Sequence, residues 1–139
     1  MVVKEILQRR NLWLAVSVVA VVALAACSDD DDGGPTAPGL PPPASATISV
    51  TTGGVNPSEV TVQPGGQVTF TNSDSVVHEM SSDPHPAHTE CPELNGGALD
   101  PGQSFTATMG GQAKTCGFHD HRDPGNRVLQ GTVRVSTGG

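Results

Sequence analysis

The sequence predicts an all-β domain, an antiparallel β-sandwich or barrel, and three observations support this prediction. After position 46, apolar side chains alternate with small polar ones in several short runs. Turn signals rich in glycine and proline separate these runs. Beyond the N-terminal segment, no stretch of ten residues has the period of an amphipathic helix. Short strands joined by such turns are typical of sandwiches and barrels.

The strand pattern appears in five segments, which are ATISVT (46–51), SEVTVQPGGQVTFTN (58–72), SVVHEM (75–80), SFTATM (104–109) and GTVRVS (131–136). The second segment contains two strands around a Pro-Gly-Gly turn. The apolar side chains of this alternating pattern should point to one face of each strand and form the core. They are Val60, Val62, Val68, Phe70, Phe105, Val133 and Val135. The domain is expected to span residues 47–137. Two long connections, 81–101 and 117–126, are candidate functional loops.

The N-terminal segment has the layout of a targeting sequence. A basic start with Lys4, Arg9 and Arg10 precedes an apolar run of about 15 residues, which is short for a hydrocarbon core of about 30 Å. Small residues then lead to Cys27 in the sequence LAAC. This segment resembles a bacterial lipoprotein signal peptide covering residues 1–26. The resemblance implies an exported, periplasmic or cell-envelope protein with a membrane anchor of acyl chains on Cys27.

The stretch 27–46 predicts a solvated linker, because four consecutive aspartates repel one another and the Gly, Pro and Ala that follow bury little apolar surface. Without the signal segment, 4 basic and 13 acidic side chains remain, which gives a formal charge of −9. Such a charge disfavours nucleic acid as a partner and favours a basic docking protein. We expect the domain to act as a monomer.

Potential metal ligands are concentrated in one part of the domain. All five histidines and the two cysteines after Cys27 lie between His78 and His121. Imidazole and thiolate together suit copper or zinc, whereas calcium and magnesium prefer oxygen. Cys116 is expected to end a further strand, His119 follows it by three positions, and alternating valines follow this pair. This spacing favours a transition-metal site.

Two stretches resemble the cupredoxins, the plastocyanin- and azurin-like blue copper proteins. One is EVTVQPGGQVTFTNSDSVVHEM, and the other is CGFHDH followed by LQGTVRV. The resemblance implies a Greek-key antiparallel β-sandwich or barrel with a mononuclear type 1-like copper site. Its ligands would be His78, Cys116 and His119. Leu129 stands where the family has its axial methionine, so the axial contact would be absent or would come from His121, Gln130 or a backbone oxygen.

The same resemblance implies an electron-transfer protein with a redox partner rather than an enzyme. The residues themselves point the same way. No serine occupies a G-x-S-x-G elbow, and the glycines form no phosphate-binding loop.

Two alternatives stay open at the level of the sequence. In an exported chain, Cys91 and Cys116 could form a disulfide, which would remove the thiolate and leave a metal-free β-sandwich module. The stretch HPAHTEC, with His85, His88 and Cys91, is either an exposed polar loop or a second metal site. A second site would favour copper capture and delivery over electron transfer.

Overall fold

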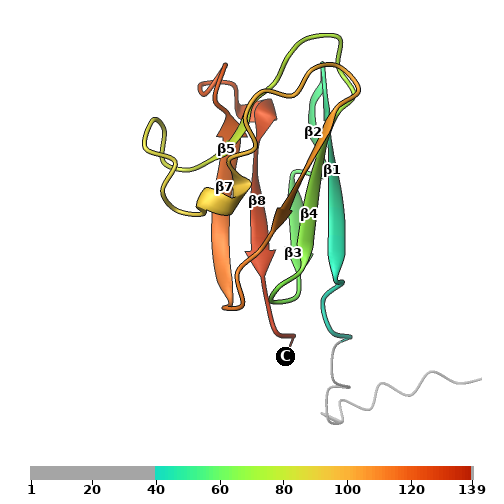
Figure 1. Cartoon of the computed structure of the whole chain (residues 1–139), viewed down its shortest axis with the longest axis vertical. Helices are drawn as coiled ribbons and strands as arrows, with labels where there is room; N and C mark the ends of the chain where they lie inside the picture. Colours follow the sequence, from blue (N-terminus) through green and yellow to red (C-terminus); the bar gives the residue numbers. More distant parts are fainter. Residues whose placement is uncertain (1–39, 139) are drawn as a thin grey trace, which may run out of the picture. The chain divides into compact units, whose positions relative to one another are not determined.

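The computed structural model describes residues 40–138, and these form two four-stranded sheets packed as a sandwich (Figure 1). The predicted signal peptide, Cys27 and most of the predicted linker lie outside the described residues. Within residues 40–138, no helix is long and apolar enough to span a bilayer. The two short 3₁₀ helices are η1 (Pro92–Leu94) and η2 (Arg127–Leu129).

Each sheet has its own strand order. The first sheet runs β2-β1-β4-β6, with β1 at Ser45–Thr51, β2 at Gly54–Asn56, β4 at Gln67–Asn72 and β6 at Ser104–Thr108. The second sheet runs β3-β8-β7-β5, with β3 at Glu59–Val62, β5 at Met80–Ser82, β7 at Lys114–Asp120 and β8 at Gln130–Val135. The all-β sandwich that the sequence predicts is therefore present.

The sheets are mixed rather than purely antiparallel. Strand β1 pairs in parallel with β4, and β3 pairs in parallel with β8, while the remaining pairs are antiparallel. Strands β3 and β4 follow one another in the sequence but lie in different sheets. Each of these two strands therefore meets a neighbour that is distant in the sequence.

The core follows the predicted alternation. Val60, Val62, Val68, Phe70, Val133 and Val135 are all buried, whereas Phe105 is partly buried and packs against them. Sequence reasoning missed Phe118, whose ring packs edge-to-face against Phe70 with centroids 5.1 Å apart. This residue falls in a stretch that was expected to be a loop.

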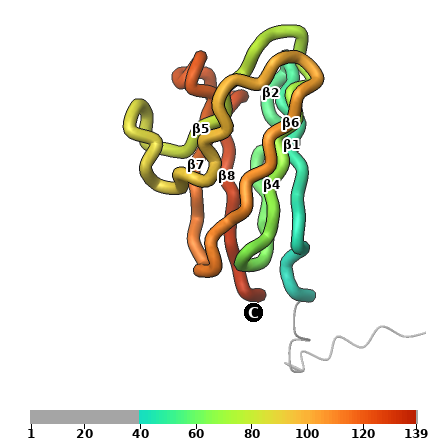
Figure 2. Tube along the Cα trace, viewed as in Figure 1, coloured from blue at the N-terminus to red at the C-terminus, as the bar shows by residue number. Residues whose placement is uncertain are grey.

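Two boundaries differ from the prediction at the end of the sandwich that holds the histidines. Strand β7 continues past Gly117 to Asp120, since its pairing with β8 extends as far as His119 and Gln130. Cys116 therefore lies inside a strand. In contrast, His78 belongs to no strand and forms only an isolated bridge with Leu99. The chain between β5 and η1 projects beyond β7 as a loop (yellow in Figure 2).

Candidate metal centre

The two cysteines of the domain form a disulfide. The Cα atoms of Cys91 and Cys116 lie 5.9 Å apart, and both residues are fully buried. The prediction that Cys116 supplies a thiolate ligand is therefore wrong, because a sulfur in a disulfide carries no thiolate charge. The alternative reading, a Cys91–Cys116 bridge, describes the structure. It arises because the loop after β5 brings Cys91 back against β7.

His78 lies between two carboxylates. Its Nδ1 is 2.7 Å from Asp120 Oδ2, and its Nε2 is 3.3 Å from Asp74 Oδ2. All three side chains are almost completely buried. Both ring nitrogens therefore already have partners, and the structure groups His78 with acidic residues rather than with the other histidines.

The two carboxylates around His78 also organise the backbone. Asp120 Oδ1 accepts hydrogen bonds from the N–H groups of Glu79 and Arg122, each at 3.0 Å. Asp74 accepts a bond from the Ser75 N–H, which lowers the pKa of Asp74 although burial opposes the shift. We read the His78 group as structural, since it ties the end of β7 to the segment before β5.

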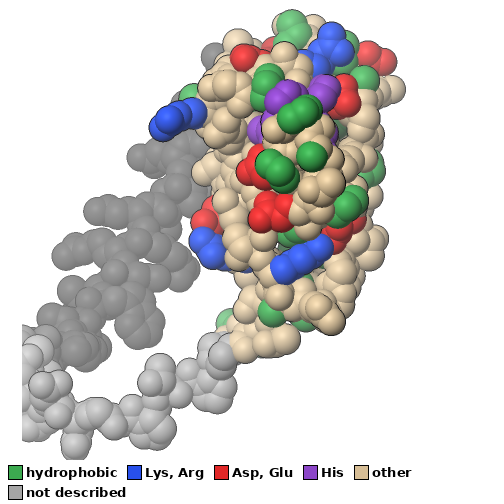
Figure 3. Space-filling view, turned by 90° about the vertical axis from the view of Figure 1, so that its left-hand side faces the viewer, with side chains coloured by type: hydrophobic (Ala, Val, Ile, Leu, Met, Phe, Trp, Pro, Cys, Tyr) green, Lys and Arg blue, Asp and Glu red, His purple; other side chains and the backbone are tan. Residues whose placement is uncertain are grey.

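The other four histidines gather at one place, and we call His85, His88, His119 and His121 the His cluster. His88 Nε2 lies 3.3 Å from His85 Nδ1 and 3.2 Å from His121 Nδ1. One nitrogen from each of these three residues lies within 4.8 Å of the other two. The ring centroid of His119 is 5.1 Å from that of His88 and 5.4 Å from that of His85. Histidine side chains, in purple, gather near the top of the face in Figure 3.

His119 has one nitrogen without a partner. Its Nδ1 is 2.6 Å from Asp83 Oδ1, while its Nε2 is buried and has no hydrogen-bond partner among the described residues. Burying an unpaired polar atom costs about 1–3 kcal/mol, so such an atom calls for an explanation. A metal ion held by several imidazoles would satisfy it.

The cluster is assembled from two segments. His85 and His88 lie on the loop after β5, where His88 has the left-handed φ of 50°, an unusual conformation for a residue other than glycine. This backbone is held by the bond from His88 N–H to Pro84 O and by Asn95 Nδ2 donating to His88 O. Backbone strain of this kind concentrates at functional sites.

The second segment is the end of β7. His119 is the penultimate residue of this strand and His121 follows it directly. The His121 N–H donates to Glu79 O at 2.7 Å, which fixes the first residue beyond the strand.

The surroundings of His88 favour its neutral imidazole. Partial burial lowers the pKa of His88, and the nearby rings of His119, His121 and His85 lower it further, while Glu79 opposes the shift. A neutral imidazole keeps the lone pair that a metal needs. The closeness of the other rings therefore also prepares His88 to bind a cation.

The cluster combines histidines that the sequence singled out for different reasons. His119 and His121, both predicted as ligands, lie in the cluster, and so do the two histidines of HPAHTEC. The latter were expected to form either an exposed loop or a separate site, and the structure places them in the same group. Sequence reasoning missed Asp83, because no motif relates it to a histidine 36 positions later.

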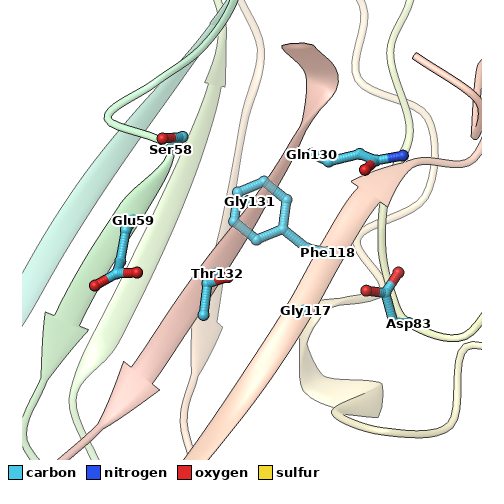
Figure 4. A pocket seen from close by; sticks show the side chains of 8 residues that line it. All are labelled: Ser58, Glu59, Asp83, Gly117, Phe118, Gln130, Gly131 and Thr132. Atoms are coloured by element: carbon cyan, nitrogen blue, oxygen red, sulfur yellow. The ribbon is translucent and has the colours of Figure 1, made fainter. Parts of the chain in front are cut away.

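The predicted axial alternatives have other contacts. The side chain of Leu129 is buried in the core, and Gln130 Nε2 donates to Pro124 O at 2.9 Å. Gln130 also lines a cleft of about 400 Å³ beside β7 and β8, together with Asp83, Gly117 and Gly131 (Figure 4). Phe118 reaches the same cleft with its ring edge.

The comparisons with known proteins bear on the fold. No protein-family model and no curated protein sequence matches the chain. Among solved structures, a purple cupredoxin from Nitrosopumilus maritimus is 23% identical, with a TM-score of 0.55 over 66% of this chain and 99% of that chain. The oxidized form of plastocyanin from Dryopteris crassirhizoma is 24% identical, with a TM-score of 0.50 over 66% of this chain and 100% of that chain.

The domain has a cupredoxin fold. A third similar structure is larger, namely the Cu-containing nitrite reductase of Thermus scotoductus SA-01. It is 17% identical with a TM-score of 0.54, and the match covers 66% of this chain but only 22% of the reductase. The cupredoxin fold therefore occurs both in small proteins of about this domain's size and as one part of an enzyme.

Proposed function

We propose that this protein is a copper-binding electron carrier of the cell envelope and that its copper centre is the His cluster. The observation that carries the proposal is the convergence of three imidazole nitrogens within 4.8 Å, with the ring of His119 close to two of these histidines. Imidazole suits copper in both oxidation states, and Cu(II) forms the most stable complexes among the divalent first-row metals. A bound copper ion would take up and release single electrons.

The residues of the chain would hold and orient the ion. His119 and His121 are fixed by β7, while His85 and His88 are fixed by the disulfide and by the hydrogen bonds of their loop. Ligands held in this way rearrange little when the charge of the ion changes, which favours electron transfer. The cupredoxin fold and its solved relatives, one of them described as Cu-containing, support copper as the metal.

Copper capture and delivery is the second candidate function. It is favoured by the exposure of His85 at the edge of the cluster and by the absence of a thiolate, which leaves nitrogen ligands alone. Ion exchange with another protein requires an accessible ligand. Electron transfer requires only that the centre lie near the surface.

The proposal is tested by titrating the purified, disulfide-intact protein with Cu(II). We expect one equivalent to bind, and we expect weak visible absorption only, because an intense band would require a cysteine thiolate. His88→Ala should abolish this binding, whereas His78→Gln serves as the matched control that removes a histidine outside the cluster. Unchanged binding in His88→Ala would contradict the proposal.

A second measurement separates the two roles. A reversible one-electron wave in voltammetry, with the ion retained in both oxidation states, supports the electron carrier. Loss of the ion to a chelator on reduction supports capture and delivery.

A further inference from the structure

Asp83 is hydrogen-bonded to both segments that form the His cluster. It is the first residue after β5, and its N–H donates to Gly117 O at 3.0 Å. Its own carbonyl accepts the N–H of Glu90 at 2.9 Å. The backbone of Asp83 is therefore bonded both to β7 and to the far end of the loop that carries His85 and His88.

The side chain of Asp83 lies over Gly117 of β7, where no side chain projects from the strand. A Cβ atom added at Gly117 would lie 2.1 Å from Asp83 Oδ2, so the carboxylate occupies space that any other residue at position 117 would fill. Figure 4 shows Asp83 beside β7 at Gly117. The glycine thus permits the carboxylate to approach the strand and to reach His119.

The contact with His119 selects one ring nitrogen. An ionised carboxylate can only accept a hydrogen bond, so the Nδ1 of His119, 2.6 Å away, must be the donor. In the neutral ring the lone pair then lies on Nε2, which is buried without a partner. The side chain of Asp83 is 49% exposed, against 3% for His119. Asp83 therefore contributes little to the core.

We propose that Asp83 is a positioning residue of the copper centre, which holds His119 so that Nε2 becomes a fourth nitrogen ligand beside His85, His88 and His121. This inference rests on the proposed copper centre. Partners of this kind orient a metal-bound histidine and raise its basicity, and their loss typically lowers metal affinity 10–100-fold.

The test compares four variants of the full, disulfide-intact chain. Asp83→Ala should bind Cu(II) about 10–100-fold more weakly, and the electron paramagnetic resonance spectrum should change from four nitrogen ligands to three. Asp83→Asn should keep the four-nitrogen spectrum, because its amide oxygen still accepts the Nδ1 proton. Gly117→Ala should resemble Asp83→Ala. Asp100→Ala, which removes an exposed carboxylate elsewhere, is the charge-matched control and should behave as the wild type.

A second readout needs no metal. Nitrogen NMR of the metal-free protein should show His119 with its proton on Nδ1, and Asp83→Ala should redistribute that proton between the nitrogens. The inference is overturned if His119 carries the proton on Nε2 in the wild type. It is also overturned if Asp83→Ala keeps the affinity and spectrum of the wild type while His88→Ala loses copper, a result that leaves the proposed function standing. A wild-type chain that binds no copper overturns both.

Discussion

Cys91 and Cys116 join the loop that carries two members of the His cluster to β7, the strand that contains His119 and directly precedes His121. Their disulfide links positions 25 residues apart, and no water reaches either residue. His119 follows Cys116 by three positions, and Cys91 follows His88 by three positions. The disulfide is thus close to the proposed metal ligands both on the loop and at the end of β7.

We predict that removing this disulfide weakens both the fold and the copper centre. For a closed loop of this length, the double variant Cys91→Ala/Cys116→Ala should lose about 3 kcal/mol of the free energy of unfolding. Copper affinity should fall as well, because His85 and His88 become less ordered before the ion binds. Urea unfolding and Cu(II) titration measure the two effects. Wild-type copper affinity in a folded double variant would show that hydrogen bonds alone hold the loop.

The two kinds of histidine should respond in opposite ways to substitution. His78→Gln leaves the buried carboxylates of Asp74 and Asp120 without their imidazole, so the free energy of unfolding should fall by about 3 kcal/mol while copper binding persists. His88→Ala should lose copper and keep most of the stability. Both variants are measured by thermal unfolding and by copper titration. A loss of copper in His78→Gln with wild-type stability would make His78 a ligand.

The ion pair of Glu93 with Lys114 predicts a pH dependence of stability. Burial raises the pKa of Glu93, but the hydrogen bond from Lys114 and other bonds outweigh it, so the pKa lies below its usual value of 4.5. The unfolded chain therefore takes up this proton at a higher pH than the folded domain does. The stabilisation is present above pH 4.5 and is lost as the pH falls through the lowered pKa.

The matching variant is Glu93→Gln. It should lower the free energy of unfolding by about 0.5 kcal/mol near neutral pH, and the difference from the wild type should vanish in acid. Urea unfolding over a pH series measures it. A difference that stays constant with pH would assign the effect to packing instead of charge.

The aromatic pair in the core supports the strand that carries His119. Phe118 is 1% exposed and packs against Phe70, so Phe118→Ala should cost about 4 kcal/mol of the free energy of unfolding. Phe118→Leu should cost less, because it fills more of the space. Denaturant unfolding of both variants gives the order. Equal stability of the two would mean that the surrounding side chains collapse into the cavity.

The alternation of apolar residues was enough to predict β1, β3, β4, β6, β8 and most of the core, because a half-buried strand has a period that is visible in the sequence. The parallel pairs were not predictable in this way, since they depend on which strand changes sheets. Strand β7 was cut short in the prediction, because Gly117 and the polar residues after it have the composition of a loop.

The candidate site was predicted in part. His119 and His121 were named as candidate ligands from the resemblance to the cupredoxins, whereas the state of Cys116 depended on whether the loop returns Cys91 to β7. That return is set by tertiary contacts such as Asp83 with Gly117, which leave no pattern in the sequence. For the same reason, the sequence could not show that His78 faces Asp74 and Asp120.

The strand registers place the His cluster and the start of the domain at opposite ends of the sandwich. Ser45 pairs with Gln67, the first residue of β4. Strand β3 ends shortly before Gln67, at Val62, which pairs with Val135. Val135 also pairs with Lys114, the first residue of β7. His119 lies five residues further along β7, which corresponds to about 17 Å of strand. A tether that enters at Ser45 would therefore leave the histidine end free to meet a soluble protein, so that docking and anchoring need not compete for the same surface.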